Sequence, residues 1–308
     1  QKTAYEIVSR DWSSDVCSSD LDFIPDCEPF MPVLTPTSIP EAAATLAAHP
    51  DAQILAGGTD FMVEVNFNHR KPSTVVSLGG VKDLRRIDQT GSSLFIGAGV
   101  TWHDIEKGPV SSLLPALAEA ARTVGSPQIR AAGTLGGNLG TCSPAGDGLP
   151  VLAALGCNVH LVSTRGERTL PFAEFMVGPK RNARSADEFI SGVTVQIPDG
   201  YQGYAKVGVR NAMVISIASA CLVVDRHKVR VALGSVGPTI IRATAAEQWL
   251  DDLQAIPGRA VTPAVAEEFG RRVADEARPI DDHRSTAAYR RHAISVISRR
   301  LLERSAQS

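Results

Sequence analysis

The sequence predicts an α+β protein of about two domains. Its 308 residues exceed a typical domain of about 100–200 residues. Short apolar stretches that end in glycine or proline, typical of strands, dominate the chain up to about residue 236. Three longer stretches predict helices near the end, over residues 243–253, 262–277 and 286–304. A hydrophobic content of 44% with 21% charged residues is typical of a globular protein.

The first third of the chain alternates between predicted strands and turns. Residues 30–50 predict a short strand, a turn and a helix that begins after Ser38, because Pro40 and Glu41 follow it. Further apolar strands are expected over residues 52–68, 73–81 and 92–100, the first of them interrupted by a Gly-Gly turn and followed by no clear helix start.

The middle of the chain adds two helices and four strands. Thr101 and Asp104 have the spacing of a capping box, and residues 112–125 predict a helix that Gly125 ends. The expected strands cover residues 157–163, 191–198, 216–225 and 228–236. The turn sequence PDGY, at Pro198–Tyr201, is the expected domain boundary.

Charge and composition argue against several classes of partner. The formal net charge is −2 and no basic block occurs, so neither nucleic acid nor an anionic membrane is expected as the main partner. No apolar run approaches the roughly 18 residues of a membrane span. The five cysteines, at positions 17, 27, 142, 157 and 221, have no metal-ligand spacing and indicate reduced thiols in the cytoplasm. No metal site is expected.

The first 21 residues, Gln1–Leu21, have neither helical nor strand periodicity and no signal-peptide core. DWSSDVCSSDL corresponds codon by codon to a common sequencing-library adapter, and QKTAYEI resembles the other end of that adapter. We therefore expect residues 1–21 to be an unstructured artefact that hides the native start. A genuine unstructured leader is the alternative.

Two glycine-rich segments, AGGTD (56–60) and TLGGNLGT (134–141), suit a dinucleotide. Glycine permits close backbone approach, and successive exposed N–H groups form a nest for anions such as a pyrophosphate. Polar side chains extend the second segment, and Asp147 could accept a bond from a ribose hydroxyl or a flavin ring N–H. Two tight turns are the alternative interpretation. A Rossmann motif is not favoured, because Trp102 replaces the third glycine of GAGVTW, and no P-loop is present.

Five stretches together resemble the FAD-binding medium subunits of molybdenum hydroxylases. They are ILAGGTDFMVEVN, GSPQIRAAGTLGGNLGTCSPAGD, KRNARSADEFI, YAKVGVRNAMVISIASACLVV and YRRHAISVISRRLL. The resemblance covers about residues 30–304 in order. It is nearest to the xanthine dehydrogenase branch of the family, followed by the carbon monoxide dehydrogenase branch.

The resemblance implies a vanillyl-alcohol-oxidase or PCMH-type FAD-binding domain over residues 22–200, with subdomains at about 22–80 and 81–200. A C-terminal α+β domain like that of the carbon monoxide dehydrogenase flavoprotein follows over 201–308. It also implies non-covalent FAD, with Lys206 near the polar edge of the flavin ring. The implied cofactor-binding residues are Ala56, Gly57, Gly58, Thr59, Asp60, Thr134, Gly136, Gly137, Asn138, Thr141, Ser143, Asp147 and Lys206.

The family also implies a division of labour. A molybdenum cofactor on a large subunit oxidises the substrate, and two [2Fe–2S] clusters on a small subunit carry the electrons to FAD. Each cluster needs four thiolates, which the spacing of the cysteines here does not offer. We therefore expect a cytoplasmic dimer of heterotrimers, in which this chain passes hydride from FADH2 to NAD+. No catalytic side chain is needed for that transfer.

Several readings of the function stay open. Xanthine or hypoxanthine is the preferred substrate of the partner chain, and a subunit of a carbon monoxide or N-heterocycle dehydrogenase is the alternative within the family. Outside it stand a self-sufficient flavin reductase and a flavin-free scaffold module.

Overall fold

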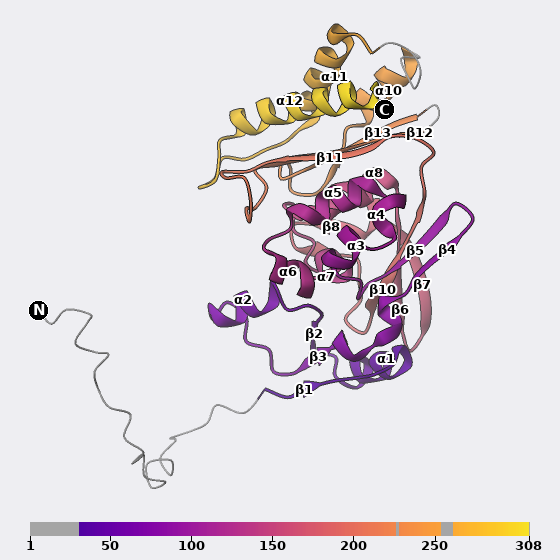
Figure 1. The fold of residues 1–308 in the computed structure, drawn as a ribbon. Coiled ribbons are helices and arrows are strands. Elements are labelled where there is room, and N and C mark those ends of the chain that lie inside the picture. The colour runs from indigo at the N-terminus through magenta and orange to yellow at the C-terminus, as the bar shows by residue number, and fades with distance from the viewer. Residues whose placement is uncertain (1–30, 226–227, 254–260, 308) are drawn as a thin grey trace, which may run out of the picture.

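The computed structural model describes residues 31–225, 228–253 and 261–307. They form three larger sheets that follow one another along the molecule (Figure 1), and one separate two-stranded sheet. The interpretation of residues 1–21 as an artefact lies outside the described residues. The expected division near residue 200 stays a prediction. It falls in the connection between β10 (Phe189–Gln196) and β11 (Gln202–Val207), which belong to different sheets.

The first sheet is small and parallel. Its strands are β1 (Val33–Leu34), β2 (Gln53–Leu55) and β3 (Val75–Ser77), in the order β1-β3-β2. The predicted helix after Ser38 is α1 (Ile39–Ala48), and the Ser38 side chain accepts a bond from the Glu41 N–H. Leu46 of α1 packs with Val76 of β3 in one cluster. Two 3-10 turns, η3 (Leu78–Gly80) and η4 (Lys82–Arg85), follow β3.

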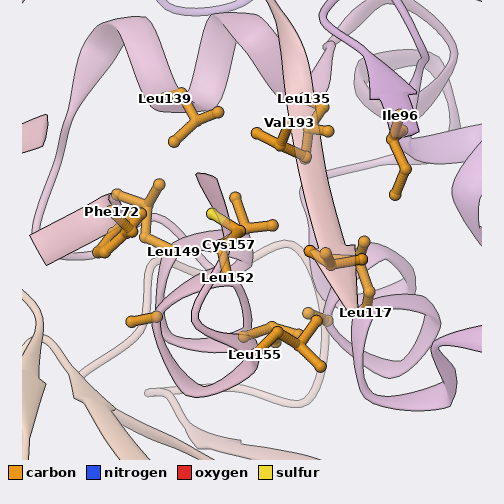
Figure 2. Packing of buried hydrophobic residues seen from close by; sticks show 14 of the residues in the cluster. Ile96, Leu117, Leu135, Leu139, Leu149, Leu152, Leu155, Cys157, Phe172 and Val193 are labelled. Carbon is orange, nitrogen blue, oxygen red and sulfur yellow. The ribbon is translucent and has the colours of Figure 1, made fainter. Parts of the chain in front are cut away.

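The second sheet is antiparallel, with the order β4-β5-β10-β6-β7. Besides β10 it contains β4 (Ile87–Thr90), β5 (Ser93–Gly97), β6 (Asn158–Ser163) and β7 (Gly166–Pro171). Of the helices between β5 and β6, α7 and α8 contact β10, and Leu135 of α7 lies beside Val193 of that strand (Figure 2). These helices are α3 (Trp102–Lys107), α4 (Val110–Leu113), α5 (Pro115–Thr123), α6 (Pro127–Ala132), α7 (Leu135–Thr141) and α8 (Gly148–Leu155). Beyond β7 come α9 (Phe172–Phe175) and the short pair β8 (Met176–Gly178) and β9 (Arg181–Asn182).

The capping box at Thr101 and Asp104 is confirmed, but the single helix expected over 112–125 is wrong. The chain forms α4 and α5 there, separated at Leu114. Pro115 disfavours helical geometry in the residue before it, and Leu114 has φ −130° and ψ 70°. The break turns α5 so that it contacts the third sheet.

The third sheet follows the order β11-β12-β13-β14 and is antiparallel. Its remaining strands are β12 (Ala218–Asp225), β13 (Lys228–Gly234) and β14 (Ile241–Arg242). The three predicted C-terminal helices are confirmed as α10 (Thr244–Asp252), α11 (Pro263–Glu276) and α12 (Ala287–Ser305). They cover the face of the sheet that points away from the rest of the molecule (Figure 1), whereas α5 and α8 contact the other face.

Candidate functional site

The structure brings the two glycine-rich segments into direct contact. A methyl group at Gly57 would lie 1.8 Å from the Ala132 carbonyl oxygen, so the first segment touches the backbone just before the second segment. A methyl group at Gly133 would lie 3.3 Å from Thr59 Oγ1, and one at Gly137 would lie 3.8 Å from Ala56 Cβ. Segments separated by more than seventy residues therefore form one surface, as the site prediction requires.

The first segment offers free backbone donors. The N–H groups of residues 57–60 find no acceptor in the part of the chain that the structure describes. Gly58 has φ +73°, a conformation that only glycine adopts without strain. The turn leads into α2 (Phe61–Asn66), a short helix that the sequence pattern did not predict. Residues 57–59 are half-buried, and N–H groups without partners at such positions favour a ligand with acceptor oxygens.

The second segment differs from the expectation. Residues 135–141 form the helix α7, not an open loop, and Thr134 caps its N-terminus by accepting a bond from the Gly137 N–H at 3.0 Å. The N–H groups of Leu135 and Gly136 donate to carbonyls of Val100 (3.0 Å) and Ala98 (2.8 Å). The expected nest of exposed N–H groups in this segment is therefore wrong. Gly136 instead lets α7 pack on β5 and the residues after it, because a methyl group there would lie 2.5 Å from Ala98 Cβ.

Side chains near α7 add polar groups to this surface. The Thr141 hydroxyl donates to the Asp60 carboxylate at 3.5 Å, which joins the two segments a second time. The amide of Asn138 lies against the glycines that flank Asp147, since a methyl group at Gly146 would lie 2.7 Å from its Nδ2. Asn138 Oδ1 is buried and has no hydrogen-bond donor among the described residues. The expected donor Ser143 accepts a bond from the Ala145 N–H through Oγ at 3.3 Å.

Asp147 and Lys206 form a buried ion pair, although they are far apart in the sequence. Lys206 Nζ lies 2.7 Å from Asp147 Oδ2, and each side chain is 9% exposed. The ammonium also donates to the carbonyls of Thr123 (3.0 Å) and Val214 (3.1 Å). Burial raises the pKa of Asp147, and the Lys206 charge opposes that shift. The pair thus joins two parts of the chain, because Lys206 lies on β11 and Asp147 lies immediately before α8.

Tyr204 is a site residue that sequence reasoning missed. Its hydroxyl donates to Asp147 Oδ1 at 2.8 Å. Burial raises its pKa well above the usual value. The available signal was the spacing of Tyr204 and Lys206, because residues two apart on a strand face the same side.

A segment that we call the strap, residues 180–188, holds the site from the side of the second sheet. The Lys180 N–H donates to the Cys142 carbonyl at 3.0 Å, and Asn182 Nδ2 donates to the Gly140 carbonyl at 2.9 Å. Lys180 Nζ also pairs with Glu64 of α2 at 2.6 Å. The strap therefore connects the end of α7 with α2.

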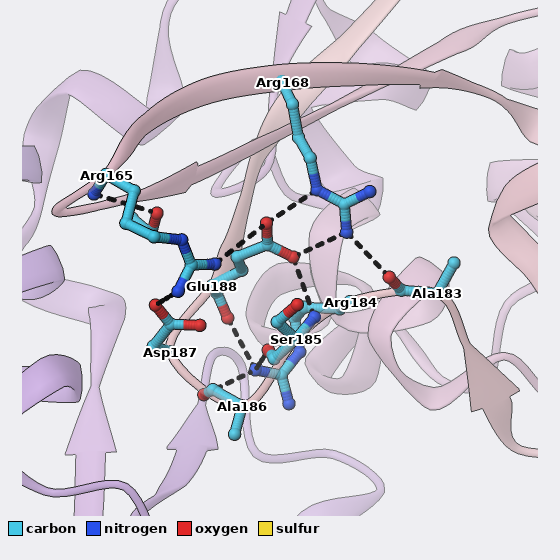
Figure 3. Close-up of polar contacts among 9 residues, drawn as sticks. Arg165, Arg168, Ala183, Arg184, Ser185, Ala186, Asp187 and Glu188 are labelled. Atoms are coloured by element: carbon cyan, nitrogen blue, oxygen red, sulfur yellow. Dashed lines mark hydrogen bonds and ion pairs between the residues drawn. The ribbon is translucent and has the colours of Figure 1, made fainter.

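Ion pairs fix the far end of the strap (Figure 3). Glu188 accepts bonds from Arg168 Nε at 2.6 Å and Nη2 at 2.8 Å, and Arg165 pairs with Asp187. The bonds from Arg168 hold the pKa of Glu188 at about 2. This pairing fixes the strap in place.

Comparison with known proteins assigns the class. Residues 28–199 match the protein family described as the FAD binding domain in molybdopterin dehydrogenase. Residues 204–305 match the family described as the CO dehydrogenase flavoprotein C-terminal domain. The predicted fold, an FAD-binding domain followed by that C-terminal domain, is confirmed. The chain belongs to the FAD-binding medium subunits of the molybdenum hydroxylases, as the resemblance implied.

Two relatives match almost the full chain. Caffeine dehydrogenase subunit beta of Pseudomonas sp. (strain CBB1) is 34% identical over 285 residues, covering 89% of this chain and 94% of its own. Nicotine 6-hydroxylase medium subunit of Paenarthrobacter nicotinovorans is 33% identical over 278 residues, covering 87% and 94%. Among solved structures, a chain of quinoline 2-oxidoreductase from Pseudomonas putida 86 has a TM-score of 0.84 at 25% identity and covers 91% and 98%.

Membership of this family confirms FAD as the cofactor and oxidoreduction as the activity to which the chain contributes. In such heteromeric enzymes the molybdenum cofactor and the iron–sulfur clusters lie on a large and a small partner chain. No helix in the described ranges is long and apolar enough to cross a membrane.

Proposed function

We propose that this chain takes electrons from [2Fe–2S] clusters on a partner and passes them through FAD to NAD+. Bound FAD supplies hydride chemistry at its flavin ring. The observation that carries the proposal is the surface made by the two glycine-rich segments, with free N–H groups on one and a buried unpartnered amide oxygen on the other.

The residues fit this cofactor. We place the pyrophosphate on the first segment, where the N–H groups of Gly57, Gly58, Thr59 and Asp60 can donate to its oxygens. Asn138 Oδ1 can accept a bond from a ligand N–H or hydroxyl, which would remove the cost of burying it unpaired. The other predicted contacts are Ala56, Thr134, Gly136, Gly137, Thr141, Ser143 and Asp147. Gly136 packs against Ala98 and therefore serves the cofactor by placing α7.

Lys206 serves the flavin ring in this proposal. A cation near the ring stabilises the negative charge that reduction places there. Asp147 then acts on FAD chiefly through Lys206, because both of its carboxylate oxygens accept bonds from protein groups.

The cysteines support electron supply by a partner. Cys142, Cys157 and Cys221 are free and fully buried, and burial raises the pKa of the Cys142 thiol to about 11. Iron–sulfur clusters need thiolates, so these cysteines are poor cluster ligands. No group of residues suited to a metal occurs in the described ranges.

We further propose a cytoplasmic dimer of heterotrimers that oxidises an N-heterocycle, with xanthine or hypoxanthine as the first substrates to try. The test is anaerobic assay of the co-purified complex with NAD+, scored by NADH absorbance. NADH formation with a purine supports the full proposal. Reduction of a dye but not of NAD+ would contradict the acceptor. Substrate oxidation by this chain without partners would favour a self-sufficient flavoenzyme.

A further inference from the structure

Asp147 holds Lys206 with one carboxylate oxygen and Tyr204 with the other. Oδ1 accepts a bond from the Tyr204 hydroxyl at 2.8 Å, and Oδ2 lies 2.7 Å from Lys206 Nζ. The Thr123 hydroxyl lies 3.3 Å from the same Oδ2. Tyr204 therefore donates to the carboxylate oxygen that Lys206 does not contact.

The position of Tyr204 is itself fixed. The residue is 4% exposed, and its backbone N–H donates to Glu119 Oε2 of α5 at 2.6 Å. Glu119 is held in turn by Arg304 of α12, 2.9 Å away. The hydroxyl consequently has a defined direction towards Asp147, set by the contacts of β11 with α5 and α12.

We propose that Tyr204 is a positioning residue that keeps Asp147 ionised and thereby sets the net charge of the Asp147–Lys206 pair beside FAD. The inference rests on the proposed function, which places Lys206 at the flavin ring. A hydrogen bond donated to a carboxylate favours its charged form, and an ionised Asp147 neutralises Lys206.

Removal of the hydroxyl has a definite electrostatic consequence. Asp147 would then take up a proton at higher pH, Lys206 would lose its counter-charge, and bound FAD would become easier to reduce. The groups that face the carboxylate are Lys206 and Tyr204 from β11 and Thr123 from α5. Glu119, also on α5, contacts the Tyr204 backbone instead. Burial raises the pKa of Asp147, and Lys206, Tyr204 and Thr123 are the described groups that oppose that rise.

The test is a potentiometric titration of the FAD-loaded full chain at a series of pH values. Tyr204→Phe removes the hydroxyl and keeps the ring. Tyr201→Phe is the matched control, because the buried Tyr201 hydroxyl has no hydrogen-bond partner among the described residues. Thr123→Val removes the weaker contact to the same carboxylate, and Lys206→Met removes the charge.

As the pH falls, protonation of Asp147 should raise the FAD midpoint potential above the value expected if Asp147 stayed ionised. We expect Tyr204→Phe to move the onset of this rise upward by about one pH unit or more, Thr123→Val by less, and Tyr201→Phe not at all. A Tyr204→Phe curve that coincides with Tyr201→Phe overturns the inference. If Tyr204→Phe does not fold, Asp147→Asn takes its place, because it removes the charge that Tyr204 is proposed to preserve; a midpoint potential equal to that of the unaltered chain at every pH then overturns the inference.

Two other results separate the inference from the function on which it rests. Failure of the unaltered chain to bind FAD overturns the proposed function itself. An unchanged potential in FAD-loaded Lys206→Met shows that Lys206 is not beside the flavin, which removes the basis of the inference and leaves FAD binding intact.

Discussion

Replacing Gly57 with alanine should push the first glycine-rich segment away from the backbone that leads into the second, and should release FAD. The added methyl group would lie 1.8 Å from the Ala132 carbonyl oxygen, so an ordinary contact of 3.4 Å requires the backbones to part by about 1.6 Å. Such a movement breaks hydrogen bonds from the free N–H groups of residues 57–60 to the pyrophosphate. Each is worth roughly 1.5–3 kcal/mol. Loss of two weakens FAD binding by about 3 kcal/mol or more, on the order of a hundredfold or greater in Kd.

The assay is titration of the apoprotein with FAD, followed by quenching of flavin fluorescence. Gly79→Ala is the matched control, because its methyl group would meet nothing closer than Ser77 Oγ at 3.8 Å. Far-ultraviolet circular dichroism checks that both variants fold. An FAD affinity of folded Gly57→Ala within threefold of the control would refute the reasoning.

Three further substitutions test contacts that stabilise the site or the third sheet. Thr134→Ala removes the cap of α7 and should lower stability by about 1 kcal/mol, whereas Thr134→Ser should keep the melting temperature. Glu188→Gln should destabilise the fold at neutral pH. Because the pKa of Glu188 is lowered to about 2, the stability that its charge contributes is present above about pH 4.5 and declines towards pH 2. The denaturant midpoints of variant and parent should therefore converge near pH 2. Arg290→Met removes a buried guanidinium that donates to the Ile217 and Ser235 carbonyls and pairs with Asp282; we expect a loss of about 3 kcal/mol by urea unfolding, and an unchanged midpoint would contradict this role.

Local sequence patterns were sufficient for most elements of the fold. Ser38 and Thr101 each place a hydrogen-bonding oxygen where a helix begins, and both caps form. The sequence predicted one helix over residues 112–125 because the apolar periodicity continues across Pro115. The residue before a proline disfavours helical geometry, so the helix stops there. α7 was missed because three of its seven residues are glycine, a composition of low helix propensity. Its stability comes from Thr134 and from packing on the second sheet, neither of which local propensity contains.

The candidate site was predictable as a set of segments, not as a set of contacts. Family motifs indicated Asp147 and Lys206 separately, but their pairing depends on how the third sheet lies against α5 and α8. Tyr204 follows from the same contact. Which backbone donors stay free is also a tertiary property: the N–H groups of residues 57–60 remain open, whereas those of Leu135 and Gly136 find carbonyls on the chain between β5 and α3.

The central claim is that this chain holds FAD on the joined glycine-rich segments. The most direct measurement is a visible absorbance scan of the purified full chain, before and after addition of FAD and gel filtration. Heat release and chromatography then identify the chromophore. We predict two flavin bands and about one FAD per chain. A colourless, folded chain that does not retain added FAD would contradict the claim.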